Sequence, residues 1–134
     1  MTTATATKTA RTVIAAATSN AAAGTTRGTL DLRTAFGGLL TLKLTNGGTG
    51  PTVAAQARIL VAHNAGATPT AASANVDWKT LWSFSGDLVA SSVTEQSIRI
   101  DDSVMHLEVE VTGNTGQAVT CEAFLSELTS INNA

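Results

Sequence analysis

The chain has 134 residues, a length that suits a single domain with a modest core. Its net charge is −2 and only 13% of its residues are charged, about half the usual share for a soluble domain. A nucleic-acid-binding protein needs a basic face, so this composition argues against one. The surface must be covered by Thr, Ser, Asn, Gly and Ala, as in a Thr/Ser-rich β-protein or in a subunit covered by its neighbours.

Residues 1–27 form the first predicted segment. They are almost all Thr, Ala, Ser and Asn, with one short apolar stretch at Val13 and Ile14. Such a segment cannot build a core, so we expect an N-terminal arm that orders on a neighbouring surface, followed by one domain over residues 28–134. No secretory signal or membrane-spanning stretch is visible, which predicts synthesis in the cytoplasm and no membrane partner.

Charge is distributed unevenly along the chain. The first thirty residues contain Lys8, Arg11 and Arg27 and no acid, whereas eight acids and only Arg99 follow from Asp87 onward. A basic end and an acidic body favour head-to-tail attraction between subunits.

Short segments with alternating apolar and polar residues begin at residue 28, and turn signals rich in Gly, Asn and Asp separate them. A long polar loop is expected over residues 64–76. The expected strands cover residues 28–35, 39–45, 52–63, 77–84, 94–100, 104–112 and 119–128. This spacing, with no convincing long helix, predicts an all-β fold: a two-sheet antiparallel sandwich of jelly-roll or Greek-key type.

The last two of these segments flank a Gly-Asn-Thr-Gly sequence and predict a β-hairpin. In the expected register Val111 pairs with Val119, and Glu108 lies opposite Glu122 on the outward face. His106, Glu110 and Phe124 would share that face, and an outward Phe on a polar strand favours an interface. The single cysteine, Cys121, excludes an internal disulfide and is expected on the inward face as a buried, inert thiol.

Catalytic and metal sites are not evident in this sequence. The two histidines, His63 and His106, have no nucleophile elbow or orienting acid in a recognisable pattern. A paired-carboxylate glycosidase would need a cleft with aromatic walls, and the carboxylates of the predicted hairpin offer too few ligands for Ca²⁺ or Zn²⁺. We therefore expect no enzyme, no cofactor and no metal.

Two tryptophans, Trp78 and Trp82, are in phase with Phe84 at period two. This phase favours packing in the core of the sandwich, since the chain has few other large apolar groups. The alternative is a platform for stacking on sugar rings, which would make the chain a glycan-binding module.

Three stretches carry a resemblance to a known class: "KTARTVIAAATSNAAAGTTRGTLDLRTAFGG", "GPTVAAQARILVAHN" with "DWKTLW", and "MHLEVEVTGNTGQAVTCEAFLSEL". They resemble small β-sandwich structural proteins of tailed bacteriophages, of the head decoration or cement type. The resemblance implies a non-enzymatic protein of the capsid surface. Such a protein forms oligomers, here a dimer or trimer, and bridges neighbouring major capsid subunits. Another virion part, such as a neck, tail, fibre or baseplate component, is the alternative within this class.

Charge pattern, apolar spots and the predicted hairpin together define an expected interface. In it, the acidic hairpin face of one subunit meets the basic arm of another subunit or basic residues of the shell. The predicted interface residues are Lys8, Arg11, Val13, Ile14, Arg27, His106, Glu108, Glu110, Glu122 and Phe124.

Overall fold

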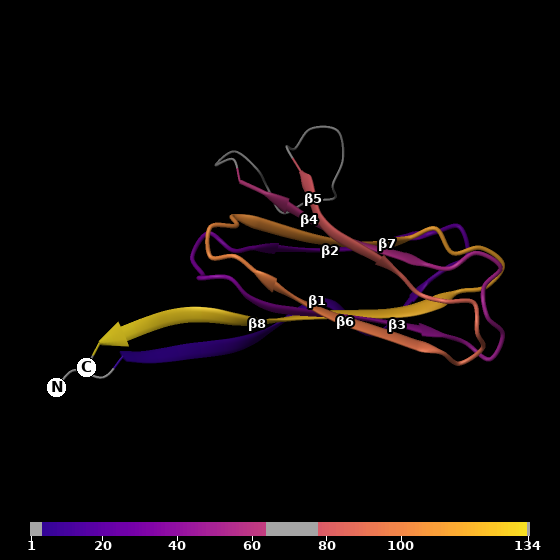
Figure 1. Ribbon diagram of the computed structural model, residues 1–134, viewed down its shortest axis with the longest axis horizontal. Helices are drawn as coiled ribbons and strands as arrows, with labels where there is room; N and C mark the ends of the chain where they lie inside the picture. The colour runs from indigo at the N-terminus through magenta and orange to yellow at the C-terminus, as the bar shows by residue number, and fades with distance from the viewer. Residues whose placement is uncertain (1–3, 64–77, 134) are drawn as a thin grey trace.

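The protein, seen in a computed structural model, is described over residues 4–63 and 78–133, and these form eight β-strands (Figure 1). The strands are β1 (Ala4–Asn20), β2 (Thr25–Asp31), β3 (Gly38–Asn46), β4 (Gln56–Ala62), β5 (Lys79–Ser85), β6 (Val93–Ile100), β7 (His106–Thr112) and β8 (Val119–Asn133). The predicted polar loop at residues 64–76 lies outside the described residues. Within the described ranges, no helix is long and apolar enough to cross a membrane.

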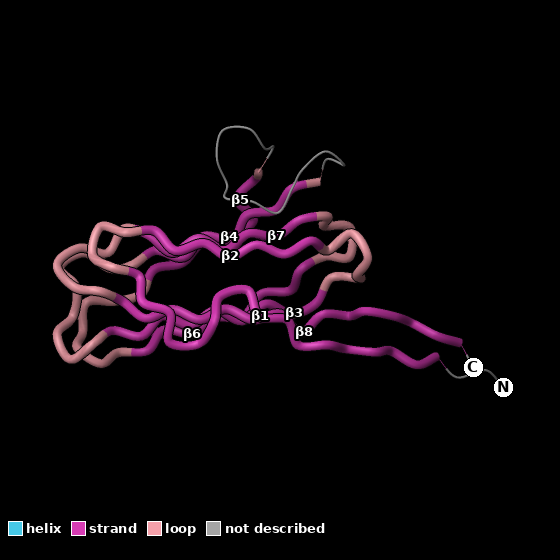
Figure 2. The backbone as a smooth tube through the Cα atoms, turned by 180° about the vertical axis from the view of Figure 1, so that it is seen from behind, coloured by secondary structure: helices cyan, strands magenta, loops and turns pink. Residues whose placement is uncertain are grey.

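The strands form two four-stranded antiparallel sheets that lie over one another as two layers (Figure 2). One sheet has the order β1-β8-β3-β6 and the other the order β2-β7-β4-β5. First pairs with last, second with seventh, third with sixth and fourth with fifth, which is the eight-stranded jelly-roll arrangement. The predicted all-β two-sheet sandwich is confirmed.

The core lies between the two sheets and is built from residues at period two. The first sheet contributes Leu40, Leu42 and Leu44 of β3, and the second contributes alternate residues of β4 and β7, all nearly or fully buried. Trp82 and Phe84 are half-buried and pack against this cluster with ring centroids 5.1 Å apart, as expected for the inward face. The expected common face with Trp78 is wrong: a register shift between Ile59 and Leu60 breaks the period of two, and the Trp78 ring contacts His106 on the side of the sheet away from the core. Cys121 is also buried in the core, as expected.

The predicted hairpin of β7 and β8 is wrong. The two strands lie in different sheets: β7 pairs with β2 and β4, and β8 pairs with β1 and β3. The connecting residues cross from one sheet to the other, and the buried side chain of Asn114 anchors them by donating to the carbonyls of Asn20 and Gln117. Alternation in sequence reports only that each strand has one apolar face. Here those faces meet across the core instead of sharing one sheet.

The N-terminal segment is also placed differently from the separate arm that was expected. Residues 4–20 form β1, which pairs with β8 along its length, with register shifts near Thr7, Thr12 and Ile14. Ile14 is buried in the core, and the backbone of Val13 comes so close to β2 that a Cβ added to Gly28 would lie 2.0 Å from the Val13 carbonyl oxygen. The Thr/Ala-rich segment finds its partner strand within its own chain.

Candidate functional site

A two-stranded ribbon projects from the sandwich and carries both marked ends of the chain (Figures 1 and 2). Strand β3 accompanies β8 as far as Glu127, and beyond this point β8 pairs only with β1 within the described residues. We call Ala4–Thr7 together with Thr129–Asn133 the terminal ribbon. It contains no charged residue. An isolated two-stranded ribbon is at best marginally stable in water, so this element is a candidate for contact with a partner.

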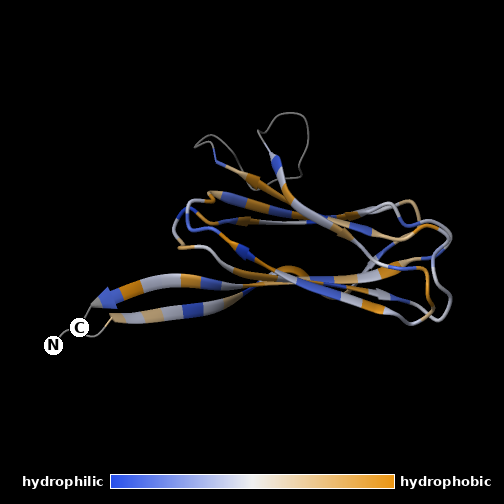
Figure 3. Cartoon of the chain, in the orientation of Figure 1, coloured by the Kyte–Doolittle hydropathy of each residue, from blue (hydrophilic) through white to orange (hydrophobic). Residues whose placement is uncertain are grey.

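One face of the ribbon continues onto the outer face of the first sheet. Register places Phe124, Leu128 and Ile131 on this face of β8, and Leu39 of β3 lies diagonal to Phe124. The exposed fractions are 40% for Phe124, 48% for Leu39 and 53% for Ile131. Figure 3 shows apolar residues recurring among polar ones along this part of β8. We call these four residues the outer apolar stripe, and large exposed side chains of this kind mark contact surfaces when they are contiguous.

Arg11 anchors the ribbon to the sandwich. Its Nη1 lies 2.6 Å from Oε2 of Glu127, whose side chain is buried at the inner face of β8. The Glu127 carboxylate is shielded from water and is held by the Arg11 guanidinium. This ion pair therefore fixes β1 against β8 at the point where β3 ends.

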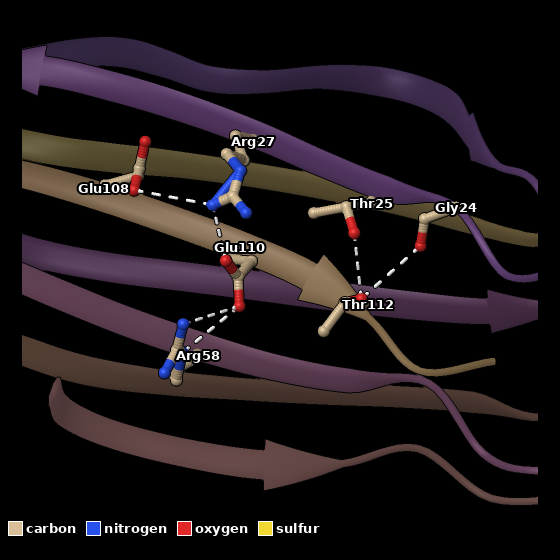
Figure 4. A network of polar contacts seen from close by, with 7 residues as sticks. All are labelled: Gly24, Thr25, Arg27, Arg58, Glu108, Glu110 and Thr112. Carbon is tan, nitrogen blue, oxygen red and sulfur yellow. Dashed lines mark hydrogen bonds and ion pairs between the residues drawn. The ribbon is translucent and has the colours of Figure 1, made fainter. Parts of the chain in front are cut away.

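A second polar feature lies on the side of β7 that faces away from the core (Figure 4). Glu110 is buried between two arginines from the neighbouring strands: Arg27 Nη1 of β2 is 2.5 Å from Oε2, and Arg58 Nη2 of β4 is 3.0 Å from Oε1. Register explains the arrangement, because both arginines lie directly opposite Glu110. Opposite charges at cross-strand positions stabilise a sheet.

Glu108 and His106 complete this row on β7, and both side chains are fully buried. Arg27 Nη1 also lies 4.0 Å from Glu108 Oε2, so one guanidinium serves two carboxylates. The ring of Trp78 meets the ring of His106 edge to face, with centroids 6.5 Å apart. The β7 face that the sequence pattern predicted as solvent-facing is therefore interior, and its charges are partnered within the chain.

At the end of β2, Asp31 receives hydrogen bonds from the side chain and the backbone N–H of Arg33. These bonds hold the pKa of the Asp31 carboxyl well below its usual range. Burial raises the pKa of the Cys121 thiol, which is consistent with the expected inert cysteine.

Two shallow hollows adjoin these features. One of about 320 Å³ opens beside the Arg58–Glu110 pair and is lined by Gln56, Ala57, Arg58, Ser83, Glu110 and Thr112. The other, about 300 Å³, lies where three residues of β1 leave the ladder, and it is lined by Ala16, Ala17, Lys43, Thr45, Thr120, Cys121 and Glu122. No group of three or more metal-ligating side chains occurs among the residues that the structure describes.

The structure does not bring the ten predicted interface residues to one surface. Lys8 and Phe124 lie exposed on the first sheet, and Glu122 is half-buried there. Ile14 belongs to the core and Val13 packs against it. Arg11 is paired with Glu127, and Arg27, His106, Glu108 and Glu110 belong to the second sheet. The expected opposition of Glu108 and Glu122 is wrong because their strands lie in different layers.

Sequence reasoning missed several residues of the exposed surface. Leu39 is exposed although it directly precedes the buried core residue Leu40, and Ile131 lies beyond the last predicted strand. Alternation along residues 52–63 puts Arg58 on the outer face of its strand, but only cross-strand register shows that it pairs with Glu110.

Comparison with known proteins supports the fold. The sequence matches no protein-family model and no curated protein. The K3 adhesin domain of Lys-gingipain from Porphyromonas gingivalis is similar in structure, with a TM-score of 0.56, 8% identity, and coverage of 81% of this chain and 71% of that one. At this identity the likeness shows the fold alone.

Two further solved structures are more distant. The SPBc2 prophage-derived protein YomS gives a TM-score of 0.43 at 16% identity, covering 90% of this chain and 94% of its own. A family 29 carbohydrate-binding module from Piromyces equi gives 0.40 at 12% identity, covering 91% and 90%. Neither likeness adds to the assignment of function.

Proposed function

We propose that this chain is a non-enzymatic virion structural protein, a capsid cement protein that binds the outside of a phage head and bridges neighbouring major capsid subunits. The observation that carries the proposal is the terminal ribbon together with the outer apolar stripe. Both are largely exposed in the single chain, both lack charge, and both are continuous with the sandwich.

The charge arrangement supports the same role. Most buried carboxylates have arginine partners within the chain, so the sandwich is held together independently of any neighbour. Attachment would then rest on the apolar stripe and on the free strand edges of the ribbon, each contributing a weak contact. Many copies on a symmetric shell convert such contacts into high avidity.

Co-sedimentation with empty shells of the major capsid protein from the same phage tests this proposal. A chain lacking residues 1–7 and 129–134 keeps every pairing of β8 with β3, so we expect it to fold but to lose shell binding. Phe124→Asp places a charge in the stripe and should weaken binding at least tenfold. Leu88→Asp, at an exposed apolar residue of a turn outside the stripe, is the matched control and should bind as the wild type does.

Circular dichroism of each variant establishes that the sandwich is intact. Shell binding that is unchanged in both the shortened chain and the Phe124→Asp variant would contradict the proposal. Electron microscopy of the particle that contains the chain would separate a head position from a neck, tail, fibre or baseplate position.

A glycan-binding module is the second candidate function, and the hollow beside Arg58 favours it. Amide, guanidinium, hydroxyl and carboxylate groups line that hollow, and such groups fix the hydroxyls of a sugar. Because Trp82 packs against the core, any stacking would fall to Trp78, which is half-buried on the same side of the sheet as His106. Titration with soluble oligosaccharides should then change the indole fluorescence of the wild type and not of Trp78→Phe. An unchanged wild-type spectrum would argue against this function.

A further inference from the structure

The edge of β8 changes character where the terminal ribbon begins. Up to Glu127 this edge pairs with β3. At Leu128 the partner is the loop before β3. The Leu128 N–H donates to the Gly37 carbonyl at 3.0 Å, and the Phe36 N–H donates to the Leu128 carbonyl at 2.8 Å. Beyond Leu128, no strand within residues 4–63 and 78–133 lies along this edge.

The ladder identifies which backbone groups point to this edge. Residues of an antiparallel strand bond alternately to one side and to the other. Leu128 bonds away from β1, so Lys8 and Leu128 do not exchange hydrogen bonds. Strand β1 has no extra residue between Ala6 and Lys8. Ala6 lies two residues before Lys8, so its pair with Ile131 also exchanges no hydrogen bonds. The N–H and C=O of Ile131 therefore point to the free edge of β8, and those of Ala6 point to the free edge of β1.

We propose that two copies of this chain pair through the free edge of β8 beyond its extra residue Thr129, with residues 130–132 antiparallel about a two-fold axis at Ile131. An antiparallel pairing of one segment with itself is isologous and closes as a dimer. Ile131 would exchange both backbone hydrogen bonds with Ile131 of the second copy, and Ser130 would lie opposite Asn132. No charged residue faces another, and the result is a four-stranded sheet of β1, β8 and their two counterparts, which exceeds the marginal two-stranded ribbon.

The opposite edge is less suited to this pairing. Strand β1 carries Lys8 next to the ribbon, and its register shifts from Thr12 onward distort the edge. A charge and a bulge are features that keep strand edges from pairing. The register shift between Thr7 and Lys8 leaves one extra residue in β8, Thr129, at the inner end of the ribbon, and from Ser130 to Asn133 the edge of β8 has neither a charge nor a shift. Phe36, 46% exposed and bonded to Leu128 at the inner end of this edge, would be covered by the second copy. Because the ribbon points away from the sandwich, the two bodies would lie at opposite ends of the dimer.

This inference deepens the proposed assembly role by naming a second copy as the partner, but its test needs no capsid. Sedimentation velocity of the full chain over a dilution series should show a species of twice the 13.6 kDa of one chain, dissociating on dilution. Ile131→Pro removes the edge N–H without removing a bond to β1, and it should abolish the dimer.

Ala6→Pro is the matched control, because it removes the corresponding N–H from the other edge of the same ribbon. It should leave the dimer intact. A wild-type chain that is monomeric at every concentration would overturn the proposal, and so would a dimer that survives Ile131→Pro but not Ala6→Pro.

Cross-linking locates the axis directly. Residues of a hydrogen-bonded antiparallel pair have Cα atoms about 5.5 Å apart, a separation that a disulfide can bridge. Ile131→Cys should therefore form an intermolecular disulfide under mild oxidation, while Asn132→Cys should not. The natural Cys121 is buried and should not interfere. Equal cross-linking of both variants would contradict an axis at Ile131.

The two proposals fail separately. A monomeric chain that still binds empty shells would sink the pairing and leave the cement role in place. A dimer of the expected behaviour that binds no shell would do the reverse.

Discussion

Strand β7 and the terminal ribbon are opposites in composition and in placement. β7 carries a histidine and two glutamates, yet each of its residues except Thr112 is buried. The ribbon carries no charge and is largely exposed. In an ordinary domain the charges would lie outside and the uncharged strand would be covered. The inversion indicates that the charges of β7 hold the fold together, whereas the ribbon is the element that the proposed partner would cover.

The largest expected effect compares two adjacent residues of β8. Leu125 is fully buried in the core and Phe124 belongs to the outer apolar stripe. Leu125→Ala should lower the free energy of unfolding by about 2–5 kcal/mol, because it removes buried methyl groups and leaves a cavity. Phe124→Ala should cost clearly less, since that ring is part-exposed. Urea unfolding of both variants measures the difference, and equal losses would show that the stripe is part of the core.

The next effect tests the interior charges against the exterior ones. Arg27→Met removes the cation between Glu108 and Glu110, so the free energy of unfolding should fall by about 2–3 kcal/mol, somewhat less than for a fully buried pair because Arg27 is part-exposed. Lys8→Met, next to the ribbon, should change it by less than about 0.5 kcal/mol. If both variants unfold at the same urea concentration, β7 does not depend on its arginine partner.

A smaller effect concerns how β1 is held against the second sheet. Gly28→Ala places a Cβ against the Val13 carbonyl oxygen and should cost about 1–3 kcal/mol. Gly48→Ala is the control, because a Cβ there meets no atom within 4 Å. Thermal unfolding followed by circular dichroism compares the two. A Gly28→Ala variant as stable as the control would mean that β1 can move away from β2 freely.

The smallest effect is a dependence on pH. The pKa of Asp31 is lower in the folded chain than in the unfolded chain, so its ion pair with Arg33 stabilises the fold above a pH of about 4, and this contribution is lost as the pH falls further. Because both side chains are part-exposed, the contribution is small. Asp31→Asn should remove that component of the acid dependence, which urea unfolding at a series of pH values measures. If the free energy of unfolding of the variant falls at low pH as it does in the wild type, other carboxylates cause the acid dependence.

Much of the fold was predictable because alternation of apolar and polar residues reports directly on a half-buried strand. The alternation in residues 39–45 predicts Leu40, Leu42 and Leu44 on the inward face, and the structure buries all three. What the pattern does not contain is the identity of the partner strand. The Gly113–Gln117 connection was expected to turn back into a hairpin, but the buried amide of Asn114 directs it across the sandwich, a contact with Asn20 that is 94 residues away in sequence.

The candidate site could be predicted less well for the same reason. Glu108 and Glu110 were assigned to a solvent-facing surface because alternation put them opposite the core face. Whether that outer face is covered depends on Arg27 and Arg58, which come from two distant strands. The apolar residues of the stripe were mostly invisible, because a single leucine or isoleucine among polar neighbours is common on any surface.

The pairing of the first strand with the last has a mechanical consequence. Ala4 of β1 and Asn133 of β8 lie side by side at the tip of the ribbon. A force that pulls these two residues apart opens the β1–β8 ladder one pair of hydrogen bonds at a time. A force that pulls both strands of the terminal ribbon in the same direction is resisted instead by the whole β8–β3 ladder, loaded in shear from Val119 to Glu127. The same ribbon is therefore easy to peel strand from strand and hard to pull out of the sandwich as a unit.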